Sequence, residues 1–160
     1  DCLLSRGLGD VYKRQDINNY WRSYQLEQNR NEIGQKIMDD LTATDNANIP
    51  THANIEEELG DVAPGLGKYV TEFAFGDIYS REGLDYRQRA ISTISALVTL
   101  GTEPQLELHI NVALTVGLTP QEISETIMHL LPYVGFPKVL NALKIVKRVY
   151  KERGVSYSSK

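Results

Sequence analysis

Histidine is the side chain whose ordinary pKa best suits proton transfer near neutral pH, and the chain has three of them. His109 falls on a helical stripe of apolar residues, so we expect its ring to point inward; the stripe is Leu106, Ile110 and Ala113. His129 stands near the end of a predicted helix, and His52 lies in a polar loop, where we expect an exposed bystander. An inward histidine is most often a core residue with a hydrogen-bond partner, so spacing alone favours that interpretation of His109 over catalysis.

Three arginines within nine residues could bind a carboxylate, because a planar guanidinium donates two parallel hydrogen bonds to it. They are Arg81, Arg87 and Arg89. Hydroxyl donors could come from three tyrosines, Tyr79, Tyr86 and Tyr133. The simpler interpretation of the arginines is the solvated start of a helix, and that of the tyrosines is core packing.

Other kinds of site lack the residues that they need. The sequence has no glycine-rich phosphate loop and no short-spaced cluster of His, Asp and Glu, so we predict neither a cofactor nor a metal site. The single cysteine, Cys2, excludes an intrachain disulfide, and this usage fits a reducing, cytoplasmic location. The net charge of −4, without a Lys/Arg block, argues against nucleic acid or an anionic membrane as a partner. No apolar run approaches the roughly 18–20 residues of a membrane span.

The first fifteen residues do not have the character of a folded segment. Residues 10–15 (DVYKRQ) read as a translated transposon-end adapter, and residues 2–9 resemble the vector-like tract that accompanies it. We therefore expect residues 1–15 to be an adapter-derived tail and residues 16–160 to form the domain. Cys2 falls in this tail, which leaves the rest of the chain without a thiol.

The elements that must position these side chains are predicted to be helices. The 160 residues, 41% of them apolar, suffice for one domain with one core, and a chain of this size often gains stability by association. Apolar residues recur at helical spacing, so we predict an all-α, single compact domain of about six to seven helices that oligomerises through helix packing. The predicted helices span about 18–41, 54–59, 64–79, 86–100, 105–116, 120–131 and 136–153, with a loop over 42–53.

Local start signals define several of these helices. Thr119 and Glu122 have the form of a capping box, and Thr102 with Gln105 forms a similar pair ahead of residues 105–116. Residues 105–116 alternate as a strand would, but the cap, a following glycine and the lack of a partner strand favour a helix. In the helix over 64–79, the expected buried stripe is Leu66, Tyr69, Val70, Phe73 and Ala74.

A series of short blocks, in order along the chain, resembles the carboxymuconolactone decarboxylase family. The blocks are YVTEFAFGDIYSREGL at 69–84, RQR at 87–89, ALVTLG at 96–101, HINVAL at 109–114, GLT at 117–119, EI at 122–123, PYVGFP at 132–137 and NA at 141–142. The resemblance covers roughly residues 60–150. It implies an all-helical fold, a helix at 105–116, and homo-oligomers, from dimer to hexamer, with sites near the subunit contacts.

The family that the chain resembles has two chemical branches. One decarboxylates a carboxylated lactone in aromatic-acid breakdown and uses no cofactor. The other, alkylhydroperoxidase-D-like, uses a Cys-x-x-Cys pair just before the family histidine and a Glu on the preceding helix. Here the cysteine positions hold Thr102 and Gln105, and the nearest match for the Glu is Ala90. A dithiol cycle needs both thiols, so a peroxidase activity is disfavoured.

The resemblance implies a role for each candidate residue. His109 matches the family histidine and is expected to transfer the proton. Arg87 and Arg89, with Arg81 beside them, are expected to bind a carboxylate, and Tyr133 to orient the substrate. The function expected from the resemblance is a cofactor-free lyase or isomerase of a small carboxylated lactone or keto acid. The alternative is a non-catalytic oligomer that binds a small carboxylate or serves a structural role.

Overall fold

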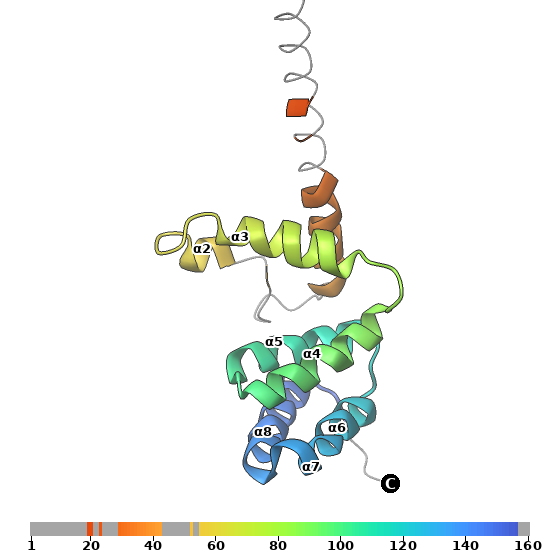
Figure 1. Ribbon diagram of the computed structural model, residues 1–160. Coiled ribbons are helices and arrows are strands. Elements are labelled where there is room, and N and C mark those ends of the chain that lie inside the picture. The colour runs from red at the N-terminus through yellow and green to blue at the C-terminus, as the bar shows by residue number, and fades with distance from the viewer. Residues whose placement is uncertain (1–18, 21–22, 24–28, 43–51, 53–54, 157–160) are drawn as a thin grey trace, which may run out of the picture.

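The computed structural model describes residues 19–20, 23, 29–42, 52 and 55–156, and the regular elements in this part of the chain are helices, with no strand. The fold is all-α, as the periodicity predicts (Figure 1). The expected tail, residues 1–15, lies outside the described residues. None of the described helices is long and apolar enough to cross a membrane.

The helices lie close to their predicted positions. A first helix covers 29–42, inside the predicted range 18–41 but for its last residue. After it come α2 (Ile55–Leu59), α3 (Leu66–Lys68), the π-helix η2 (Tyr69–Tyr79), α4 (Tyr86–Leu100), α5 (Glu103–Thr115), α6 (Pro120–His129), α7 (Leu131–Val134) and α8 (Phe136–Glu152). The ambiguous segment 105–116 is therefore helical, and the expectation of a helix there is confirmed.

Two of the described helices begin with a capping box, in which side chains hydrogen-bond to the backbone of the first turn. Asp85 and Gln88 form a capping box at α4, and Thr119 with Glu122 forms the predicted one at α6. The predicted pair at Thr102 is wrong, because the Thr102 side chain makes no capping hydrogen bond. Its backbone has ψ of 83°, far from the extended value of the two working caps, so the hydroxyl is not directed at the first turn. Proline in that first turn supplies the start signal instead.

Among the described residues, the apolar interior consists of two clusters that meet at α5. The larger cluster joins α4, α5, α6 and α8 around fully buried residues such as Ile94, Ile110 and Ile127. The smaller cluster joins the helix over 29–42 to η2 through Met38 and Phe75, and α5 adds Val112 to it. Figure 1 shows these two layers, with the first helix and η2 on one side and α4 to α8 on the other. Residues of α5 thus face both clusters.

The stripe predicted for the segment 64–79 is wrong in part. Tyr69 and Phe73 are 70% and 57% exposed, whereas Glu72, Phe75 and Gly76 are buried. The cause is the π-helical hydrogen bonding of η2, in which each bond spans five residues rather than four and the buried face shifts along the sequence. This shift turns the carboxylate of Glu72 inward.

The first helix crosses η2 at very short range. A methyl group on Gly34 would overlap the backbone oxygen of Thr71, and one on Gly76 would overlap the backbone oxygen of Arg30. The crossing is also held by Arg30, whose Nε and Nη2 donate to the carboxylate of Asp77 at 2.8 and 2.6 Å. The crossing fixes one wall of the cavity described below.

Candidate active site

His109 lies on the side of α5 that faces the smaller cluster, and its ring meets a second histidine. The centroids of the His109 and His52 rings are 5.0 Å apart at an interplanar angle of 61°. Both side chains are only partly accessible to solvent. Proton-transfer groups from two distant parts of the chain are therefore in direct contact.

His52 is not the exposed bystander that its polar sequence context predicts. Its ring packs edge-on against Phe75 at 5.1 Å, and Phe75 in turn contacts the ring of Tyr79 at 5.0 Å. The prediction fails because the surroundings of His52 come from η2 and α5, which the flanking residues do not reveal. No signal in the residues around His52 pairs it with His109.

Burial keeps both histidines neutral at neutral pH. Desolvation lowers the pKa of His52 from 6.5 to about 4. The pKa of His109 is also lowered to about 4, first by desolvation and then by the charge of His52. Neutral His109 is thus available as a proton acceptor, and protonation of both rings at once is disfavoured. In the described part of the chain, Nδ1 of His52 is buried and has no hydrogen-bond partner.

A cavity of about 430 Å³ lies beside His52. Its described lining includes His52, Lys68 and Glu72, but not His109, so His52 stands between the cavity and the family histidine. Lys68 Nζ is 3.8 Å from the buried carboxylate of Glu72. Glu56 also lines the cavity, and its carboxylate accepts hydrogen bonds from the backbone N–H groups of Gly65 and Gly67, which lower its pKa. The ionisable side chains among the described lining residues are therefore an ammonium group paired with Glu72, two carboxylates and an imidazole.

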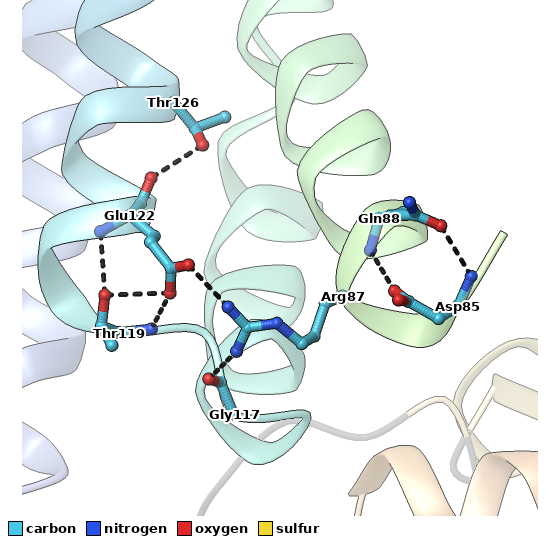
Figure 2. A network of polar contacts seen from close by, with 7 residues as sticks. All are labelled: Asp85, Arg87, Gln88, Gly117, Thr119, Glu122 and Thr126. Atoms are coloured by element: carbon cyan, nitrogen blue, oxygen red, sulfur yellow. Dashed lines mark hydrogen bonds and ion pairs between the residues drawn. The ribbon is translucent and has the colours of Figure 1, made fainter.

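Arg87 is engaged in a polar network with Gly117 and Glu122, as Figure 2 shows. Its guanidinium donates to the carbonyl of Gly117 and, at 2.6 Å, to the carboxylate of Glu122. The same carboxylate accepts from the backbone and the hydroxyl of Thr119, and these bonds, followed by Arg87, lower its pKa. Arg87 thus ties the start of α4 to the turn between α5 and α6.

The other predicted ligand-binding residues also have partners of their own. Arg89 donates to the carbonyls of Leu84 and Arg81, at 3.2 and 2.6 Å, and lies 5.6 Å from the centre of the Tyr79 ring. The side chain of Arg81 is exposed. Tyr133 is 74% exposed, and its ring lies 5.7 Å from that of His129. The contacts described for Arg81, Arg87, Arg89 and Tyr133 do not join them to His109, and their roles in binding substrate stay predictions.

Sequence reasoning missed His52 and Glu72. Glu72 carries a weak signal, since it is an acidic residue in a mostly apolar stretch, but the inward turn depends on the π-helix. At the positions of the redox branch, Ala90 is buried in the larger cluster and Gln105 is exposed. No group of three or more His, Cys, Asp or Glu residues in the described regions could hold a metal ion.

Comparison with known proteins gives consistent similarities. The model of the carboxymuconolactone decarboxylase family matches residues 64–148. The chain is 32% identical over 100 residues to a 4-carboxymuconolactone decarboxylase of Acinetobacter baylyi, covering 62% of this chain and 75% of that protein. It is 38% identical over 93 residues to an uncharacterised 15.0 kDa protein of Paracoccus denitrificans, covering 57% and 69%. It is 30% identical over 83 residues to the nitrosuccinic acid decarboxylase of Metarhizium robertsii, covering 52% and 58%.

Proposed function

Because the chain belongs to the carboxymuconolactone decarboxylase family, we propose that it is a carboxy-lyase of a small carboxylated lactone or keto acid, with His109 as the proton-transfer residue. Two of its relatives are named decarboxylases, and their named substrates are small acids. The observation that carries the proposal is the contact between His109 and His52 beside a cavity large enough for a small organic acid.

Decarboxylation requires one proton and the stabilisation of one electron pair. When the C–C bond to the carboxylate breaks, CO2 leaves and the electron pair stays on the substrate carbon, delocalised into the neighbouring carbonyl as an enolate. That carbon must then receive a proton. His109 is neutral in the free protein, and the negative charge of a bound substrate raises its pKa, so the ring takes up a proton as substrate binds. Transfer of this proton to carbon, for which the substrate must reach past His52 to the His109 ring, returns His109 to its neutral form.

The proposal needs neither a cofactor nor a thiol, and Thr102, Gln105 and Ala90 stand where the redox branch has its reactive groups. We expect the chain to act as a homo-oligomer in the cytoplasm, as the family resemblance and cysteine usage imply. The arginines assigned to the substrate carboxylate would then act together with residues from a second copy.

The proposal is tested by substitution of His109. The His109→Ala variant should lower kcat for decarboxylation of 4-carboxymuconolactone or nitrosuccinic acid by about 100-fold or more, which is the usual contribution of a general acid or base. Release of CO2 and loss of substrate absorbance measure the rate, and far-ultraviolet circular dichroism checks the fold. The matched control is His129→Ala, at an exposed histidine of α6, which should keep the wild-type rate. Unchanged turnover in His109→Ala would refute the assignment.

A non-catalytic carboxylate-binding protein is the second candidate. It is favoured by Ala90, a buried apolar residue at the position where the other branch of the family has an acidic group. This candidate predicts that a small carboxylate raises the Tm of the wild-type protein while no acid of the panel is decarboxylated. The decarboxylation assay therefore separates the two candidates.

A further inference from the structure

We propose that His52, which lies outside the family-matched segment 64–148, is a positioning residue for His109 and forms the wall of the site that a small ligand meets first. The role in turnover rests on the proposed function, whereas the coupling between the two rings does not. His52 acts through His109, because its ring holds the His109 ring in place. Because the two rings are in contact, a positive charge on one disfavours a positive charge on the other.

The orientation of His52 is defined from two sides. Phe75 packs against one side of its ring at 5.1 Å, and His109 meets it at 5.0 Å. Phe75 shares the smaller cluster with Val112, which lies three residues after His109 on α5. Since residues three apart lie on neighbouring positions of a helix surface, the same cluster defines the positions of both rings. Loss of the His52 ring would therefore free one side of His109.

The polar atoms of His52 point to a functional rather than a packing role. Buried side-chain nitrogens nearly always have a hydrogen-bond partner, yet Nδ1 of His52 has none among the described residues. His52 also lines the cavity of about 430 Å³, which His109 does not. A phenylalanine would fill the gap between Phe75 and His109 without an unsatisfied atom. A buried imidazole nitrogen without a partner lowers the stability of the fold, so we interpret the histidine at this position as serving function rather than packing.

The charged groups near the pair each have a partner of their own. Glu72 of η2 lies 3.8 Å from Lys68 of α3, and the carboxylate of Glu56 in α2 accepts two backbone hydrogen bonds. On the far side of Phe75, the guanidinium of Arg89 lies over the ring of Tyr79. After burial, the cause that lowers the pKa of His109 is the charge of His52. Protonation of either ring thus disfavours protonation of the other.

The test uses His52→Phe, which keeps an aromatic ring and its burial but removes the charge. Titration of the imidazole resonances by NMR should show the pKa of His109 rising above its wild-type value of about 4. The alkaline limb of the pH profile of kcat/KM should move to higher pH by the same amount, because the reaction needs the proton that His109 carries. The reciprocal variant, His109→Phe, should raise the pKa of His52, since coupling between two sites is mutual.

The controls separate the outcomes. His129→Phe should leave the pKa of His109 unchanged, and His52→Gln provides a polar, uncharged variant if the phenylalanine disturbs packing. A pKa of His109 that does not move in either His52 variant would overturn the proposal. So would a lower rate without any shift of the alkaline limb, because that result indicates a packing role alone. If the pKa rises while the wild-type protein decarboxylates nothing, the coupling stands and the proposed function fails.

Discussion

At the scale of single residues, the neutral histidine pair links stability to pH. The ordinary pKa of 6.5 applies to both rings in the unfolded chain, and burial lowers it to about 4 in the folded one. Between these values the unfolded chain binds more protons than the folded one, so acid favours unfolding. The free energy of unfolding should therefore be constant with respect to these two groups above about pH 6.5 and fall as the pH drops toward about 4.

This dependence is measurable by urea unfolding at about pH 7, 6 and 5, followed by circular dichroism. Each histidine contributes at most about 1.4 kcal/mol for each pH unit in this window, and the partial exposure of the rings makes the contribution smaller. His52→Phe should reduce the slope of the free energy of unfolding against pH. One of the two titrating imidazoles is removed, and the pKa of His109 rises toward its unfolded value. Equal slopes for the wild type and His52→Phe would contradict the assigned burial of the pair.

At the scale of elements, local hydrogen bonds explain which features of the fold are readable from sequence. The starts of α4 and α6 could be predicted because their capping residues, Asp85 and Thr119, bond to the first turn of their own helix. The inward turn of Glu72 could not, because it depends on the π-helical register of η2, which has no comparable local signature. The contact of His52 with His109 could not either, because it joins separate elements across the meeting point of two clusters.

A substitution of Arg87 tests whether this residue holds two helices together or binds a ligand. In Arg87→Met the carbonyl of Gly117 and the carboxylate of Glu122 lose their donor, so the α5–α6 turn is less tightly tied to α4. Because the pair is partly exposed, we expect a modest fall in Tm, on the order of 2–4 °C by calorimetry. KM for a carboxylated substrate should change less than about twofold.

The matched control is Arg81→Met, at an exposed side chain close by in sequence, which should leave Tm unchanged. A rise in KM of about tenfold or more in Arg87→Met, with Tm preserved, would instead support the carboxylate-binding role that the family resemblance implies. The two readouts are independent, so the experiment assigns Arg87 either to the scaffold or to the substrate.

At the scale of the whole molecule, two clusters share one helix, and the candidate residue His109 lies on that helix between them. His109 occupies the surface of α5 between its contributions to the larger cluster, such as Ile110, and to the smaller one, Val112. His52 and the cavity lie on the side of the smaller cluster. This arrangement explains why helix prediction located His109 correctly but gave no view of its surroundings.

The surface of the described chain predicts association. Tyr133, Phe136 and Leu140 are more than half exposed, and they lie close together in sequence across α7 and the first turns of α8. Because large apolar side chains gathered on one surface usually mark a contact, we expect light scattering to show a homo-oligomer between dimer and hexamer. A double variant, Phe136→Glu with Leu140→Glu, should shift the protein toward the monomer. Val62→Glu, at an exposed apolar residue in the turn after α2, should not. A monomeric wild type at micromolar concentration would contradict the prediction, and the complete site would then have to be built within one chain.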